Sequence, residues 1–276
     1  MTIPIMHPVS EATLSLLMKD LPQSLLLMGP VGVGLGTAAQ YIASEIGDVS
    51  FTVLPEKDDK INIEKGVISV DSIRRLYLQT RSIQTGKRVI IIDYAERMGS
   101  PAQNAFLKLL EEPGEGTYFI LVTHSPSRLL PTITSRAQLL ELRPITRTQS
   151  EAFLDTLMVN DATKRTQLLF MADGLPAELT RLVNDEAYFE SRASIVRDAR
   201  DILQGTTYRK LQVAQKYKDN REAALALLLD ASNILHRSIS AKPQESLIVQ
   251  IDALLFAHQQ IQANGNIRLC LARLVL

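Results

Sequence analysis

The sequence has few of the residues that mark several common protein classes. Its 276 residues include one cysteine, Cys270, and no tryptophan, and aromatic residues make up only 5%. A single cysteine excludes an internal disulfide and a zinc site built from a cysteine cluster, and it is typical of a reducing compartment. No run approaches the roughly 18 apolar residues of a membrane-spanning helix, and no basic stretch followed by an apolar run opens the chain. We therefore expect a cytoplasmic protein with no zinc or other metal site, no membrane segment and no signal peptide.

An excess of charge of one sign is also lacking. Thirty lysines and arginines balance thirty aspartates and glutamates. A protein that binds nucleic acid on its own usually carries a basic excess, so any DNA contact here should be local or shared with partners. Apolar residues make up 46% and charged residues 22%, which is typical of a globular chain rather than a disordered one.

The first 143 residues alternate short apolar runs with amphipathic stretches. Strands are expected at 25–28, 51–54, 88–92, 118–123 and 138–142. Helices are expected up to Ile46 after a glycine-rich turn, from Asp71, and over about 101–112, where Pro113 ends the pattern. The polar stretch 55–66 is expected to be a loop. Strands that alternate with helices predict a parallel sheet covered on both faces.

From Thr146 onward the periodicity is helical, with no convincing strand. We predict three domains: an αβα domain over 1–145, a small helical domain over 146–205 and an all-helical domain over 206–276. The last contains apolar runs that exceed one face of a helix, which favours an oligomerisation module over a self-contained bundle. The bundle remains the alternative.

A glycine-rich turn has the position of a phosphate-binding loop, since it follows a strand and opens a helix. Gly29 and Gly34 match the frame G-x-x-x-x-G-K-[ST], but Leu35 and Gly36 stand where the lysine and the hydroxyl belong. A shifted register that uses Thr37 puts Gly36 at the lysine position. The loop either contacts an anion through its backbone N–H groups or merely makes a tight turn.

Two strand ends carry further candidate nucleotide contacts. Asp93 ends a strand where phosphate-loop ATPases hold the carboxylate of the Mg²⁺ side, but Tyr94 follows in place of the glutamate base. Thr123 ends the next strand at the position of a polar sensor, and Ala177 stands where a second sensor would be an arginine. The degenerate site as a whole comprises Gly29, Gly32, Gly34, Leu35, Gly36, Thr37, Asp93 and Thr123. With lysine, hydroxyl and base all missing, we expect no ATP hydrolysis.

Two motifs carry a resemblance to a known family. Residues 104–113 read NAFLKLLEEP and residues 129–136 read LLPTITSR, with Ala137 following. Both are similar to signatures of bacterial clamp-loader subunits of the AAA+ class, in which a cysteine takes the place of Ala137. The resemblance implies an AAA+ αβα domain with a parallel sheet, a small helical lid and an all-α collar. The four-cysteine zinc module of many relatives is absent.

Members of this family are of two types: the motor subunits gamma and tau, which hydrolyse ATP, and the delta-prime type, which does not. The degenerate loop and Tyr94 favour the delta-prime type. The resemblance implies that Arg136 acts as an arginine finger on ATP held by a neighbouring motor subunit, and that the chain needs no cofactor of its own. The implied partners are motor subunits, a delta subunit, the sliding clamp and, within the complex, primed DNA. The alternatives are a weakly active gamma/tau-type ATPase and a stand-alone DNA-binding or scaffold protein with a relic fold.

Overall fold

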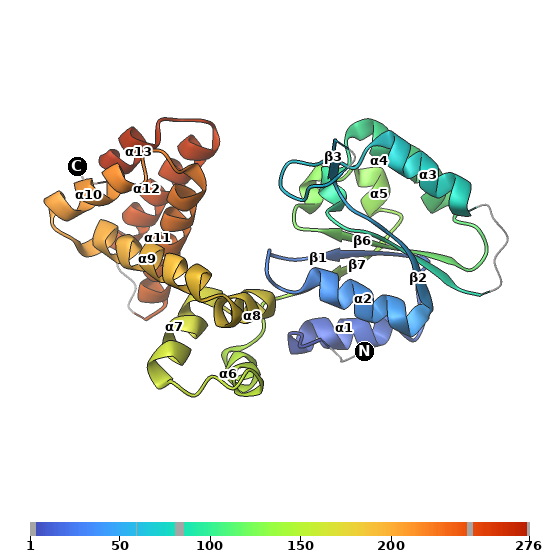
Figure 1. Cartoon of the computed structure of the whole chain (residues 1–276), viewed down its shortest axis with the longest axis horizontal. Coiled ribbons are helices and arrows are strands. Elements are labelled where there is room, and N and C mark those ends of the chain that lie inside the picture. The colour runs from blue at the N-terminus through green and yellow to red at the C-terminus, as the bar shows by residue number, and fades with distance from the viewer. Residues whose placement is uncertain (1–3, 59, 81–85, 242–244, 275–276) are drawn as a thin grey trace. The chain divides into compact units, whose positions relative to one another are not determined.

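A computed structural model describes residues 4–58, 60–80, 86–241 and 245–274. The strands are β1 (Ser24–Met28), β2 (Asp48–Val53), β3 (Glu56–Lys57), β4 (Lys60–Ile61), β5 (Arg88–Ile92), β6 (Thr117–Thr123) and β7 (Gln138–Glu141). The α-helices are α1 (Pro8–Leu17), α2 (Leu35–Ile46), α3 (Val70–Thr80), α4 (Ser100–Glu111), α5 (Pro131–Thr134), α6 (Arg147–Thr156), α7 (Ala162–Ala172), α8 (Pro176–Asn184), α9 (Glu186–Gln204), α10 (Thr207–Lys216), α11 (Arg221–Ala241), α12 (Glu245–Gln262) and α13 (Ile267–Arg273). The chain forms two compact units, Met1–Arg181 and Leu182–Leu276 (Figure 1).

The first unit is built on a five-stranded sheet in the order β2-β5-β6-β1-β7. All four neighbouring pairs are parallel, as the alternation of strands and helices predicted. The inner strand β5, which lies between β2 and β6, has every residue buried, from Arg88 to Ile92, and its β-branched side chains suit a strand that is covered on both faces.

Helices cover both faces of this sheet (Figure 1). One face packs against α1 and α2, and the other packs against α3, α4 and α5. Each strand divides its side chains between the two faces, because successive residues of a strand point in opposite directions. Leu25 and Leu27 of β1 thus face α2, whereas Leu26 lies in the cluster that contains Phe106 of α4 and Phe119 of β6.

Several short elements of the first unit differ from the sequence-based expectation. The stretch 55–66, expected to be a loop, contains the short antiparallel hairpin β3–β4, in which Glu56 pairs with Ile61 and Lys57 with Lys60. Strands of two charged or exposed residues leave no apolar period to detect, so the hairpin was missed. Helix α1 was also not anticipated, although Pro8 is favoured in a first helical turn.

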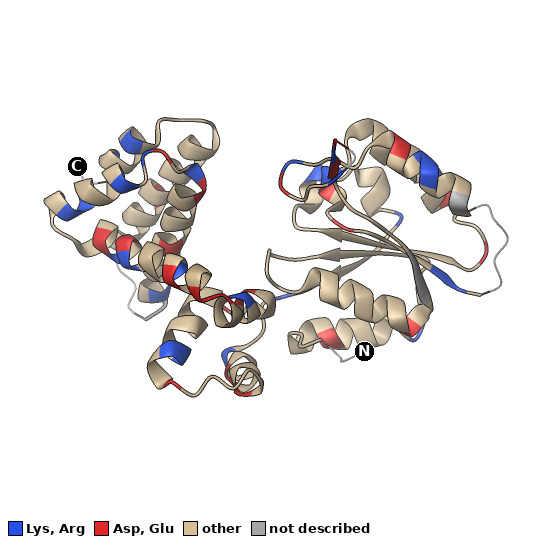
Figure 2. Ribbon diagram, viewed as in Figure 1, with Lys and Arg blue, Asp and Glu red and all other residues tan. Residues whose placement is uncertain are grey.

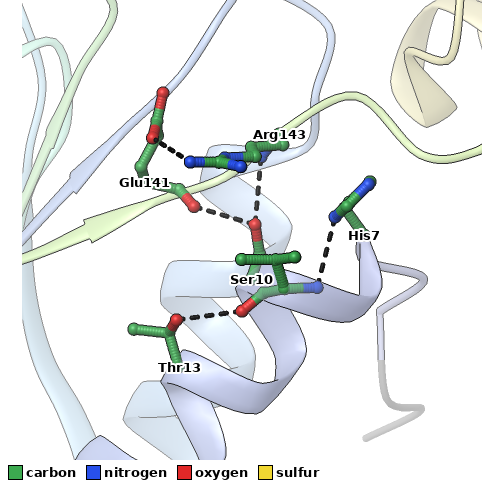
Figure 3. A network of polar contacts seen from close by, with 6 residues as sticks. His7, Ser10, Thr13, Glu141 and Arg143 are labelled. Atoms are coloured by element: carbon green, nitrogen blue, oxygen red, sulfur yellow. Dashed lines mark hydrogen bonds and ion pairs between the residues drawn. The ribbon is translucent and has the colours of Figure 1, made fainter.

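Helix α1 closes the edge of the sheet beside β7 through a small polar network (Figure 3). The buried hydroxyl of Ser10 donates to the carbonyl of Glu141 at 2.8 Å and accepts the backbone N–H of Arg143 at 3.1 Å. The Arg143 guanidinium also contacts the Glu141 carboxylate at 3.4 Å. One serine hydroxyl therefore satisfies backbone groups that a further strand would otherwise pair.

The second unit is helical throughout its described residues. Helices α9 to α13 surround one apolar cluster, to which α9 contributes Ala199 and Ile202. Arg192 of α9 and Asp230 of α11 form a largely buried, two-pronged ion pair with N···O distances of 3.0 and 3.1 Å. Helix α9 thus belongs to the core of this unit, whereas the predicted boundary between the second and third domains falls after it. The division into three domains stays a prediction.

No helix in the described residues is both long and apolar enough to cross a membrane.

Candidate functional site

The carboxyl ends of the parallel strands bring the predicted site residues to one edge of the sheet. Met28, the last residue of β1, lies beside Thr123, the last residue of β6. Ile92 of β5 lies beside Leu121 of β6, so Asp93 leaves the sheet at the same edge. The glycine-rich loop follows Met28 directly. The structure therefore brings the loop, Asp93 and Thr123 to the same edge of the sheet.

The first glycine of the loop is required by a close approach of two backbones. A Cβ atom on Gly29 would lie 2.6 Å from the carbonyl oxygen of Leu142. Further along, Gly32 and Gly34 have φ values of +88° and +96°, a left-handed conformation that glycine adopts without strain. Gly34 is also the N-cap residue of α2. The loop thus keeps the tight strand-to-helix turn of a phosphate-binding loop.

The residue at the lysine position points into the protein. Leu35 is only 2% exposed and belongs to the apolar cluster between α2 and the sheet, together with Ala38 and Ile42. Gly36 and Thr37, in contrast, are exposed at the start of α2. A lysine at position 35 would place its charge among apolar side chains, where an unpaired ammonium is strongly disfavoured. Position 35 therefore carries an apolar side chain in an apolar environment.

The first turn of α8 packs against the outside of the loop. The N–H of Ala177 donates to the carbonyl oxygen of Gly32 at 2.9 Å. A Cβ atom on Gly32 would meet Glu178 at 3.4 Å and Leu175 at 3.5 Å. One of the N–H groups at the amino end of α8, which could otherwise bind an anion, is therefore satisfied by the loop itself. Ala177 holds the loop through its backbone at the position where a second sensor was sought.

Asp93 is present but is held by its own neighbour. Its Oδ1 atom accepts the N–H of Tyr94 at 2.9 Å. Burial raises the pKa of Asp93 above its ordinary value, against the opposing effects of the Tyr94 N–H and of His124. Glu96 adds a smaller upward shift to the pKa of Asp93.

Tyr94 replaces the catalytic base with an aromatic ring in a left-handed backbone conformation, at φ 54°. The ring packs edge-on against His124, with 5.6 Å between the ring centroids. Burial raises the pKa of the Tyr94 phenol, with further upward effects of Asp93 and Glu96. The side chain thus has neither the charge nor the basicity of the glutamate that it replaces.

His124 ties the loop to the sheet, a role that the sequence analysis did not foresee. Its Nδ1 atom lies 3.0 Å from the carbonyl oxygen of Gly29, so this nitrogen carries the proton and donates it. The backbone N–H of His124 donates to Oε1 of Glu96 at 3.3 Å. The other carboxylate oxygen of Glu96 is buried and has no hydrogen-bond partner in the described part of the protein. Glu96 therefore holds the backbone of His124 through one carboxylate oxygen, while the other lies buried.

Thr123 is fully buried, and its hydroxyl oxygen accepts the N–H of Ser125 at 3.1 Å. This bond shapes the turn after β6. The hydroxyl of Thr123 therefore takes part in a local turn, and its role as a sensor stays a prediction.

Arg136, the predicted arginine finger, follows the short helix α5 and lies on the surface with 40% of its side chain exposed. Its Nη1 atom donates to the carbonyl of Thr132 at 3.1 Å. Its Nη2 atom lies 2.9 Å from Oε1 of Glu111, the last residue of α4. The sequence offered no signal for this ion pair, because the two residues belong to separate elements.

The position of α5 depends on a buried glutamine of α4. Gln103 is 3% exposed, and its amide nitrogen donates to the carbonyls of Met98 and Arg128, each at 3.0 Å. Its amide oxygen accepts the N–H of Leu130, the N-cap residue of α5, at 2.7 Å. One side chain therefore fixes the start of the segment that carries Arg136. Sequence reasoning missed Gln103, although a glutamine in an otherwise apolar helix face is a signal of a buried polar contact.

The charges of the described residues are mixed rather than separated. Figure 2 shows basic and acidic residues interspersed along α3 and α9. Among the described residues, no group of three or more histidine, cysteine, aspartate or glutamate side chains is arranged to hold a metal ion. The features that stand out chemically are therefore the altered loop and the exposed Arg136.

Comparisons with known proteins find similar sequences. The model of a family described as "DNA polymerase III, delta subunit" matches residues 48–146. A protein named DNA polymerase III subunit delta' from Bacillus subtilis is 28% identical over 245 residues, which cover 79% of this chain and 73% of the relative. The protein of the same name from Pseudomonas aeruginosa is 31% identical over 207 residues, or 64% of this chain. The match spans 60% of the Pseudomonas protein, less than two thirds of its length.

A solved structure shares the fold over almost the whole chain. The gamma subunit-related protein of DNA polymerase III from Thermotoga maritima covers 96% of both chains with a TM-score of 0.55. The two sequences are 16% identical, so this likeness concerns the fold alone. It agrees with the predicted class, a parallel AAA+ sheet followed by helices.

Proposed function

The chain belongs to the clamp-loader AAA+ family, in the group of DNA polymerase III delta-prime subunits, and we propose that it serves in a clamp loader without hydrolysing ATP itself. The observation that carries the proposal is the burial of Leu35 at the lysine position, where it is 2% exposed. Gly36 in place of the hydroxyl and Tyr94 in place of the glutamate base support the same conclusion. We accordingly expect no nucleotide cofactor in the chain's own loop.

In this proposal, the chemistry of the chain is supplied by Arg136 to a neighbour. A guanidinium is always charged and can contact two phosphate oxygens at once. Such a group stabilises the charge that develops in phosphoryl transfer and accelerates it by roughly 10³–10⁵. The partly exposed side chain of Arg136 at the end of α5 suits this task, and Gln103 fixes the backbone that carries it. The neighbour would be a gamma- or tau-type motor subunit that holds the ATP.

The assembled complex would open a sliding clamp and place it on primed DNA. We propose motor subunits, a delta subunit and the clamp as partners, with DNA contacted only within the complex, in the cytoplasm. The helices that follow Arg181 would form the collar that joins the subunits. Exposed apolar side chains in this unit support such a contact surface, among them Tyr208, Phe256 and Leu269.

Phosphate release from Mg-ATP by the purified chain separates this proposal from a weakly active gamma/tau-type ATPase. We expect release no faster than background. Turnover that disappears in Asp93→Ala would establish the motor-type alternative. A stand-alone DNA binder would instead bind primed DNA without partners, with an affinity that falls steeply as salt rises. The balance of thirty basic and thirty acidic residues argues against that outcome.

A further inference from the structure

The ion pair between Glu111 and Arg136 joins two elements that meet at the surface. Glu111 ends α4, and Arg136 follows α5. The distance between Oε1 of Glu111 and Nη2 of Arg136 is 2.9 Å, and the two side chains are 52% and 40% exposed. The other terminal nitrogen of Arg136 donates to the carbonyl of Thr132 at 3.1 Å. The guanidinium is therefore held from two sides, once by its own segment and once by α4.

The helix itself gains little from a glutamate at this place. The carboxyl end of a helix carries a partial negative charge, which disfavours an acidic side chain in the last turn. Glu111 stands in that last turn. The contact with Arg136 stabilises a carboxylate here, because the guanidinium offsets the charge of Glu111 and the partial negative charge at the helix end.

Among the described residues, the two contacts leave most of the guanidinium free. An arginine side chain has five N–H donors. The contacts with Glu111 and Thr132 engage one donor on each of the two terminal nitrogens. Three N–H groups remain to contact phosphate oxygens, so Glu111 can stay in place while Arg136 acts.

We propose that Glu111 is a positioning residue, which holds the guanidinium of Arg136 in the orientation that the neighbouring ATP requires. The inference rests on the proposed function, since it assumes that Arg136 acts on a neighbour. A long side chain that is already held loses less freedom when it engages phosphate. Gln103 fixes the backbone at the start of α5, and Glu111 fixes the charged end of the finger, so both ends depend on α4.

The test uses the assembled loader with clamp and primed DNA, and compares four versions of this subunit: unsubstituted, R136A, E111Q and E112Q. Single-turnover hydrolysis of bound ATP is followed by rapid quench. R136A identifies the kinetic phase of the neighbouring site, because that phase should disappear. We expect E111Q to slow the same phase about two- to fivefold, the range that an exposed ion pair supports, with its amplitude and the affinity for ATP unchanged. E112Q removes an equal charge from the adjacent position and should leave the phase unaltered.

The outcomes separate the finger role of Arg136 from the positioning role of Glu111. If R136A removes no phase, the proposed finger is wrong, and the role of Glu111 falls with it. If R136A removes a phase whose rate E111Q leaves unchanged or increases, Arg136 is a finger that Glu111 does not position. An equal slowing by E112Q would also overturn the inference, because the effect would then reflect general charge. Complex assembly, measured by size-exclusion chromatography, should be the same for all four versions.

Discussion

Replacing Leu35 with lysine restores the charge that the loop lacks and tests whether the surroundings accept it. Leu35 is 2% exposed within the cluster between α2 and the sheet. We expect L35K to lower the free energy of unfolding by about 3 kcal/mol, of which roughly 2 kcal/mol is the lost burial of the leucine and the rest is the cost of an ammonium near apolar groups. The variant should gain neither ATP binding nor hydrolysis.

Two control variants separate the contributions to this loss. L35M has a similar length and volume but no charge, and it should cost less than about 1.5 kcal/mol. G36K places the lysine at the alternative register, where the residue is exposed and an added Cβ would have only Oδ2 of Asp93 nearby, at 4.0 Å. G36K should be as stable as the unsubstituted chain or up to about 1 kcal/mol more stable, because glycine weakens a helix.

Chemical denaturation and titration with a fluorescent ATP analogue measure both properties. The reasoning is refuted if L35K unfolds at the same denaturant concentration as L35M, or if it binds Mg-ATP saturably. Either result would mean that the loop can rearrange to expose position 35. Binding by G36K alone would instead support the shifted register, in which Thr37 supplies the hydroxyl.

Three further predictions concern stability and assembly. S10A should lower the free energy of unfolding by roughly 1–3 kcal/mol in denaturant, because backbone groups of Glu141 and Arg143 lose their buried partner. D93N should stabilise the chain increasingly as pH rises from about 4. Burial raises the folded-state pKa of Asp93 above 3.8, so the stability that its protonated form contributes is lost as pH rises through that pKa. Melting temperatures of D93N and the unsubstituted chain that differ equally at pH 4 and pH 8 would contradict this. A fragment that ends at Arg181 should stay folded by circular dichroism yet fail to join partner subunits in size-exclusion chromatography, and stable assembly would disprove the collar.

Sequence patterns predicted the sheet well because its strands are apolar and bounded by turn residues. The expected run 88–92 is strand β5 with the same bounds, and 118–123 differs from β6 by one residue. The hairpin β3–β4 was missed because two-residue strands have no period. Helix α5 was also missed, since the four residues Pro131–Thr134 are too few for a helical repeat to be recognised.

The sequence predicted which candidate residues lie together at one edge of the sheet, but not the contacts that they make. Spacing along the chain identified the altered loop, Asp93 and Thr123, because phosphate-binding sites use fixed offsets from strand ends. The hydrogen bonds that hold the loop join residues that are distant in the sequence. His124 donates to the carbonyl oxygen of Gly29, and Ala177 donates to that of Gly32. Nothing in a single sequence couples such pairs, since each depends on how the chain folds back on itself.

The central claim is that this chain supplies Arg136 to an ATP site that another subunit holds. Steady-state ATP hydrolysis by the reconstituted loader, with clamp and primed DNA, tests it most directly when the unsubstituted subunit is compared with R136A. Because the Arg136 side chain is 40% exposed, the account predicts that R136A folds and assembles normally, yet lowers hydrolysis by the complex. If the complex that contains R136A hydrolyses ATP as fast as the unsubstituted complex, the claim is contradicted.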